Sequence, residues 1–162
     1  MGNPRALIRN RGEGENLWFA GGGVFTMKAS CAETDGAFMM FEDHVVRGKC
    51  TPMHRHPHED ELVYVLDGEL LVHVDGHDHR VGKGGLFFAP RGVAHAFLVT
   101  SETAHLLCLQ TPGSGEPFYR DVSEPSTSEA DAARPPDLAR LRAGAQRSDS
   151  IELLGPPPFE QR

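Results

Sequence analysis

Short apolar runs broken by glycine or charged residues extend from about residue 17 to residue 109, as in GAFMMFEDHVV, ELVYVLDGELLVHVDG and GGLFFAPRGVAHAFLV. Runs of this length bounded by turn residues are typical of β-strands. Asp67-Gly68 and Asp75-Gly76 stand where the apolar alternation pauses, and Asp-Gly favours tight hairpin turns. The pattern predicts an antiparallel meander, closed into a sandwich or barrel that hides its edges.

The composition changes after Thr111, where TPGSGEP predicts a loop. Ser126 and Glu129 have the spacing of a helix capping box, and Asp137 is placed to cap a second short helix, DLARLRAGA. We expect both helices to pack outside the strands. The last segment, IELLGPPPFEQR, contains too many prolines to continue a helix, so it is either a docked strand or a frayed end.

Length and charge narrow the classes of function. A chain of 162 residues is most simply one domain. Its 16 Lys and Arg against 23 Asp and Glu give a net charge of −7, which opposes a nucleic-acid partner. The three cysteines fit neither a disulfide framework nor a zinc ribbon, so we expect reduced thiols. No apolar run has the length of a membrane helix, and MGNPRALIRNRGEG lacks the core of a secretory signal, so we expect a cytoplasmic protein.

The stretch HRHPHEDE, residues 54–61, combines three histidines with three carboxylates. On a strand, His54 and His56 share a face with Cα atoms about 6.6 Å apart, and two such imidazoles can chelate one ion. Glu61 is an odd step of five residues from His56, so regular alternation would place it on the opposite face. Pro57 interrupts the strand, and we expect the break to let a new strand begin with Glu61 pointing inward.

A site of two histidines and one carboxylate has room for a further ligand, and His95 is the best candidate. His95 lies in the apolar run APRGVAHAFLV, where a histidine is either a ligand or a hydrogen-bonded core residue. A chelate of His54, His56 and His58 is a rival arrangement, although Pro57 disturbs the strand that it needs. Both readings stay open on spacing alone.

The remaining polar residues have simpler interpretations. We expect His58, Glu59 and Asp60 to lie outside the barrel or at its lip. We expect the histidines around the Asp75-Gly76 turn, which are His73, His77 and His79, to form a solvated hairpin tip. His44 is either an ordinary surface residue or a group that faces the cavity. Cys50 lies near His54, and we interpret it as an inert thiol.

The full spacing resembles the two motifs of the cupin superfamily. The first run reads G-x5-H-x-H-x4-E-x6-G and the second reads G-x5-P-x-G-x2-H. They comprise Gly48, His54, His56, Glu61, Gly68, Gly84, Pro90, Gly92 and His95. The resemblance covers about residues 40 to 105 and departs from the family only at Val99, where an Asn is usual.

The resemblance implies an all-β fold, a small antiparallel jelly-roll-like β-barrel with short C-terminal helices. It also implies one divalent transition metal ion held by His54, His56, Glu61 and His95. It divides the chain into an N-terminal arm and strands (1–36), the barrel core (37–111) and a C-terminal loop and helical extension (112–162). Because this arm crosses to a second subunit in many cupins, we expect a homodimer.

The chain also resembles small bacterial cupins of the quercetin 2,3-dioxygenase-like group in two segments outside the motifs, NLWFAGGGVFTM and PGSGEPFY. This resemblance implies oxidative opening of a flavonol or similar enolisable aromatic substrate with O2, with Glu61 both as ligand and as catalytic base. The aromatic and sulfur-bearing residues that either fill the core or line the substrate pocket are Phe38, Met40, Tyr64, Phe97 and Phe118.

The ligand set does not choose among iron, nickel, manganese, cobalt, zinc and copper. Two rival functions also remain. One is a non-oxidative cupin enzyme, such as a polyketide cyclase, isomerase or lyase, in which the metal acts only as a Lewis acid. The other is a non-catalytic cupin that binds a small molecule; the chain has no basic face or helix pair suited to DNA.

Overall fold

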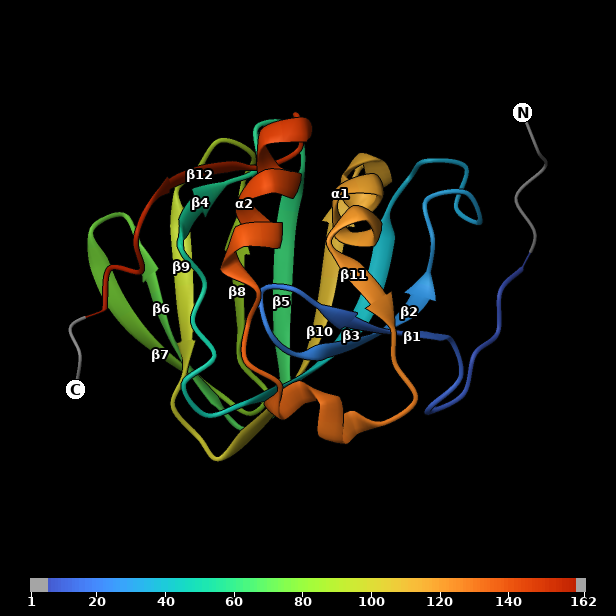
Figure 1. The fold of residues 1–162 in the computed structure, drawn as a ribbon, viewed down its shortest axis with the longest axis horizontal. Coiled ribbons are helices and arrows are strands. Elements are labelled where there is room, and N and C mark those ends of the chain that lie inside the picture. The colour runs from blue at the N-terminus through green and yellow to red at the C-terminus, as the bar shows by residue number, and fades with distance from the viewer. Residues whose placement is uncertain (1–5, 160–162) are drawn as a thin grey trace.

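A computed structural model describes residues 6–159, whose strands form two facing β-sheets (Figure 1). The first five residues of the predicted N-terminal arm and the last three of the predicted C-terminal extension lie outside the described residues. Within the described chain, no helix is long and apolar enough to cross a membrane.

Each sheet combines strands that are distant in sequence. The larger sheet contains, in spatial order, β11 (Ser123–Pro125), β1 (Glu15–Phe19), β2 (Val24–Ala29), β3 (Met39–Val46), β10 (Thr103–Thr111), β5 (Asp60–Asp67) and β8 (Leu86–Ala89). The smaller sheet contains β12 (Glu152–Gly155), β4 (Met53–Arg55), β9 (His95–Val99), β6 (Glu69–Val74) and β7 (His77–Gly82).

This connectivity corrects the predicted meander. From β3 to β10 the chain crosses repeatedly between the sheets, so β10 lies between β3 and β5 rather than beside β9. The all-β jelly-roll-like prediction is confirmed, but the two sheets do not join into one closed ladder among residues 6–159. In the described part of the N-terminal segment, β1 pairs with β2 and β11 of the same chain. A crossing of this segment to a second subunit stays a prediction.

The C-terminal segment adds two short 3-10 turns, η1 (Gly113–Gly115) and η2 (Glu129–Ala133), and the helices α1 (Glu116–Asp121) and α2 (Leu138–Arg147). Asp137 caps α2 as predicted, because its carboxylate accepts from the backbone N–H of Arg140 at 3.0 Å. The predicted cap at Ser126 is wrong; Ser128 caps η2 instead. The final segment docks as β12 along β4, one of the two predicted outcomes.

Strict alternation of buried and half-buried positions defines the interior of the larger sheet. In β3 the buried positions begin at Met39 and recur every second residue, and in β5 they begin at Glu61. The apolar members of these sets join one core with residues from the smaller sheet, such as Leu70 and Val72. β3 and β5 therefore each present one face to the space between the sheets and one face outward.

The two Asp-Gly pairs have different roles. Asp75 and Gly76 both have positive φ angles, 53° and 76°, and join the paired strands β6 and β7 as the predicted hairpin. Asp67-Gly68 is not a hairpin, because β5 and β6 belong to different sheets. It is a corner at which the chain changes sheets, and Gly68 has a φ angle of 87°.

The corner is sterically closed to any side chain. A Cβ atom on Gly68 would lie 2.5 Å from the carbonyl oxygen of Thr103 and 2.8 Å from Cα of Ala104. At Gly76 a Cβ would meet nothing within 4 Å. The two glycines thus share a positive φ angle but differ in the space around them.

We expect Gly68→Ala to lower the free energy of unfolding by about 3 kcal/mol, because backbone strain and a clash with backbone atoms add together. Gly76→Ala, which adds only the strain, should cost about 1 kcal/mol. Urea denaturation of both variants measures the difference. Equal losses would contradict the steric role of the corner.

Candidate metal centre

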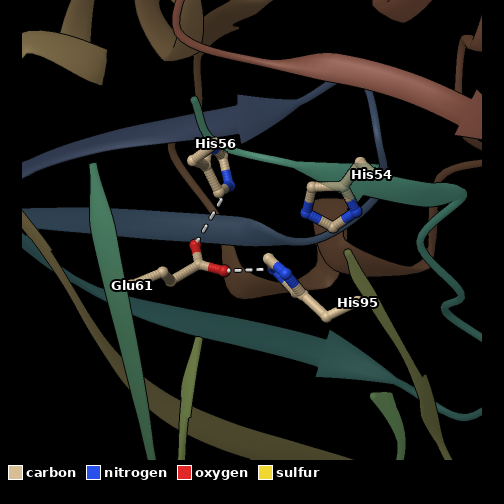
Figure 2. Close-up of side chains that lie close together, drawn as sticks. All are labelled: His54, His56, Glu61 and His95. Carbon is tan, nitrogen blue, oxygen red and sulfur yellow. Dashed lines mark hydrogen bonds and ion pairs between the residues drawn. The ribbon is translucent and has the colours of Figure 1, made fainter. Parts of the chain in front are cut away.

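Four potential ligands from both sheets converge between them (Figure 2). His54 lies on β4 and His95 on β9 of the smaller sheet, Glu61 lies on β5 of the larger sheet, and His56 follows the end of β4. One ligand atom from each residue lies within 4.8 Å of those from the other three. All four residues are buried, with exposed fractions of 1–8%.

The strand break predicted at Pro57 brings Glu61 to this point. β4 ends at Arg55 and β5 begins at Asp60, so the intervening residues carry the chain from the smaller sheet to the larger. Glu61 then faces His54 and His56 from the opposite sheet. Across the smaller sheet, His54 pairs directly with His95, with ring centroids 4.4 Å apart.

The turn that precedes His95 is tied to the histidine stretch by backbone and side-chain contacts. The N–H of Gly92, whose φ angle is 81°, donates to the carbonyl of His56 at 2.8 Å. Arg91 binds the carboxylate of Asp60 through Nη2 at 2.9 Å and Nε at 3.1 Å. These contacts fix the two motifs relative to each other.

All three imidazoles are oriented in the same way, each by a carbonyl oxygen close to Nδ1. His54 is paired with Pro52 at 2.8 Å, His56 with Ser150 at 2.9 Å, and His95 with Val93 at 2.9 Å. Because a carbonyl only accepts hydrogen bonds, each Nδ1 must be the donor and carry the proton. Each Nε2 is therefore the atom available to a metal, as in histidine ligands whose Nδ1 is held by a protein group.

The carboxylate of Glu61 and the three imidazoles lie close enough to change one another's pKa. Nε2 of His95 lies 2.9 Å from one oxygen of Glu61, and Nε2 of His56 lies 3.7 Å from the other. Burial and the neighbouring imidazoles lower the pKa of His54 to about 3, so this ring is neutral. Burial would lower the pKa of His95, but its hydrogen bond to Glu61 raises it. Burial would raise the pKa of Glu61, but the nearby imidazole of His56 and the hydrogen bond to His95 lower it.

Two further polar residues adjoin the cluster, and sequence reasoning missed both. Gln110 is fully buried on β10, directly opposite Glu61 in the strand register. Its amide nitrogen lies 3.0 Å from Glu61 Oε1, 2.9 Å from the hydroxyl of Tyr119 and 3.3 Å from Nε2 of His56. Burial raises the pKa of Tyr119 well above its usual value, so its hydroxyl stays protonated.

The donor chemistry fits a divalent cation. Three imidazole nitrogens and one carboxylate, pointed at one another in a buried space, form a set of acceptors that is stabilised by a positive charge at its centre. The amide of Gln110, which donates to one oxygen of Glu61, is a further polar group beside this set. Nitrogen and oxygen donors of this kind suit zinc, iron, nickel, manganese, cobalt and copper.

The predicted pocket residues occupy different environments. Met40 and Tyr64 are half-buried, on faces of β3 and β5 opposite the buried set that includes Glu61, so alternation directs them away from the cluster. Phe97 shares its face of β9 with His95 and packs against the core. Phe118 packs on Tyr119 with ring centroids 5.3 Å apart, and Phe38 lies before β3 and is half-buried.

Residues near the cluster in sequence separate from it in space. His58 is exposed in the turn, as expected. Glu59 corrects the prediction of a position outside the barrel or at its lip: it is 1% exposed, and it accepts a hydrogen bond from Ser114 at 2.5 Å. His44 occupies a half-buried position in β3 and lies 3.6 Å from Glu129. Burial raises the pKa of Cys50 to about 11, which suits an inert thiol.

We expect the chain to bind one Co(II) ion per molecule, and His54→Ala to weaken binding by more than about 100-fold, because it removes one of four donors. His58→Ala, which changes an exposed histidine of the same stretch, is the matched control. Elemental analysis and Co(II) titration by visible absorption measure both. Equal binding by the two variants would contradict the four-residue site.

Gln110→Leu should weaken Co(II) binding by about 10- to 100-fold, because Glu61 loses the donor that holds its carboxylate. The visible absorption bands of the bound Co(II) should also shift, a change that a merely structural role would not produce. Gln146→Leu, at an exposed site on α2, is the matched control. An unchanged spectrum and affinity in Gln110→Leu would show that Gln110 does not position Glu61.

Two known proteins are similar in sequence to part of this chain. Quercetin 2,3-dioxygenase of Bacillus subtilis is 26% identical over 118 residues, which is 73% of this chain and 35% of that protein. The tetracenomycin polyketide synthase protein TcmJ of Streptomyces glaucescens is 32% identical over 62 residues, covering 37% of this chain and 42% of that protein. The chain therefore matches about a third of the first relative and less than half of the second.

A solved structure has a similar fold, and a family model matches the segment that contains the candidate ligands. An RmlC-like cupin from Shewanella frigidimarina superposes with a TM-score of 0.57 at 22% identity, covering 68% of this chain and 95% of that one. The family model for the cupin domain matches residues 42–110, which contain the four clustered residues and Gln110. The chain therefore contains a cupin domain.

Proposed function

We propose that this protein is a metal-dependent dioxygenase acting on a flavonol or a similar enolisable aromatic compound. The observation that carries the proposal is the buried set of three imidazoles and one carboxylate. The Nδ1 atoms of all three imidazoles are held by carbonyl oxygens. The likeness to quercetin 2,3-dioxygenase over most of this chain supports the choice of reaction.

A transition metal bound to this set would supply Lewis acidity toward a substrate oxygen and a route for electrons between substrate and O2. The chain's own residues provide the remaining functions. Glu61 is the group placed to accept the proton of a substrate hydroxyl, because its carboxylate is ionised and its two oxygens face different partners. Gln110 holds one of those oxygens and so keeps the carboxylate directed at the cluster.

The surroundings of the cluster suit a flat, largely apolar substrate. Phe87 and Phe97 lie on the strands that flank it, with the Phe87 ring 6.1 Å from the ring of His95. Tyr119 adds an aromatic ring and a protonated hydroxyl on the side of Gln110. Low exposure of all four candidate ligands limits the access of water to a bound aromatic compound.

A second candidate function is a non-oxidative cyclisation of a polyketide, in which the same residues act without O2. The likeness to a tetracenomycin polyketide synthase protein favours it, over the segment of 62 residues that the two chains share. Both reactions begin with an enolisable aromatic or polyketide oxygen near Glu61. Oxygen consumption separates them.

The test uses the full chain loaded with each of the candidate metals in turn, and quercetin as substrate in an oxygen electrode. We expect stoichiometric O2 uptake with quercetin, and at least a 1,000-fold lower rate for His54→Ala, because an incomplete ligand set no longer holds the metal. His58→Ala should retain the rate of the unmodified protein.

The outcome also decides between the two reactions. The absence of O2 uptake with every metal, together with conversion of an aromatic polyketide under nitrogen, would replace the dioxygenase by the cyclase. Equal rates for His54→Ala and the unmodified protein would contradict both, because each depends on the same ligands.

A further inference from the structure

A large cleft lies apart from the metal centre, between the C-terminal segment and the loop that joins β3 to β4. Its volume is about 1170 Å³, and it is bounded by α2, β12 and residues 46–52. Figure 1 shows α2 and β12 on the same side of the molecule, next to β4. None of the four clustered ligands lines the cleft. Pockets for small molecules commonly occupy about 300–1,000 Å³, so its size suits a ligand with several rings.

The walls of the cleft are mainly apolar and partly rigid. Leu141 and Ala145 of α2 lie on one side, and Ile151 and Leu153 lie on another. Proline rings complete the walls, at Pro52, Pro135, Pro136, Pro156 and Pro157. Such side chains lose little conformational freedom when a flat apolar molecule packs against them.

The charges in the cleft are almost all positive, although the chain has a net charge of −7. The cationic lining residues are Arg47, Lys49, Arg134 and Arg142, and the acidic one is Glu152. Glu152 is already bound to Arg55 at 2.6 Å. The cleft is therefore a local basic site on an acidic protein.

Two of the four cations already have partners. Arg134 binds Glu124 at 2.7 Å and stacks on Trp18, and Lys49 donates to the carbonyl of Gly22. The charge of Asp43 also acts on Lys49. These contacts leave the two other arginines as the groups open to a ligand.

Arg47 and Arg142 are exposed, and neither side chain makes an ion pair or hydrogen bond with any residue from 6 to 159. Arg47 comes from the loop between β3 and β4, and Arg142 comes from α2, so they approach the cleft from different elements. A guanidinium binds a carboxylate in a bidentate manner and stacks on aromatic rings. The pair thus offers charge to one end of a ligand whose body lies on the prolines and leucines.

The cleft also adjoins the groups that orient two ligands of the metal centre. Pro52, which lines the cleft, provides the carbonyl that accepts from His54 Nδ1. Ser150, whose carbonyl accepts from His56 Nδ1, lies between the lining residues Ser148 and Ile151. The cleft therefore adjoins the backbone that orients His54 and His56.

We propose that this cleft is a second binding site, which takes a small aromatic carboxylate with its ring system on the apolar walls and its carboxylate on Arg47 and Arg142. The site is independent of the metal and of the reaction at Glu61. Its occupant differs from the substrate of the metal centre in needing a negative charge and no metal.

The test is isothermal titration of the full, metal-free chain with 2-naphthoate and with its uncharged analogue 2-naphthamide. We expect 2-naphthoate to bind at least ten-fold more tightly than the amide. The double variant Arg47→Gln, Arg142→Gln should remove this preference while leaving weak binding of both compounds. Because both arginines are exposed, the variant should keep the fold, which thermal unfolding verifies.

Two controls locate the site. Arg80→Gln removes one positive charge from β7, away from the cleft, and should leave the preference unchanged. His58→Ala, at an exposed position that does not line the cleft, should also leave it unchanged. Equal binding of the two compounds, no binding of either, or loss of the preference in Arg80→Gln or His58→Ala would each overturn the proposal.

Discussion

The orientation of three buried imidazoles is the constraint on which the centre depends. Each Nδ1 proton is committed to a backbone carbonyl, so each Nε2 atom points into the same small space beside the carboxylate of Glu61. Burying several acceptors together costs free energy unless a positive charge compensates them. A proton between Glu61 and His95 can do so in part, and a divalent cation can serve all four donors at once.

The jelly-roll connectivity makes this convergence possible. His54 and His95 are neighbours within the smaller sheet, while Glu61 and Gln110 are neighbours within the larger one. Because the chain changes sheets between β4 and β5, residues only a few positions apart face each other across the interior. The bond from Gly92 to the carbonyl of His56 then fixes the distance between the two motifs.

The C-terminal segment supports the metal centre and also forms the proposed second binding site. It provides the carbonyl of Ser150 for His56, the strand β12 that pairs with β4, and Tyr119, which adjoins Gln110. The same segment forms most of the basic cleft. The two barrel motifs therefore do not by themselves hold His56 in place or form the proposed second site. A cupin fold by itself does not determine the chemistry.

Local chemistry in the sequence was sufficient for the strand pattern, the break at Pro57, the cap at Asp137 and the grouping of His54, His56, Glu61 and His95, the last with the help of a family resemblance. It was insufficient wherever the answer depended on which strands pair. No local pattern singles out Gln110, because its place opposite Glu61 follows from the pairing of β10 with β5. Met40 and Tyr64 looked like pocket residues until the register assigned them to the other face. Pairing between distant strands is set by packing of the whole core, which no local pattern encodes.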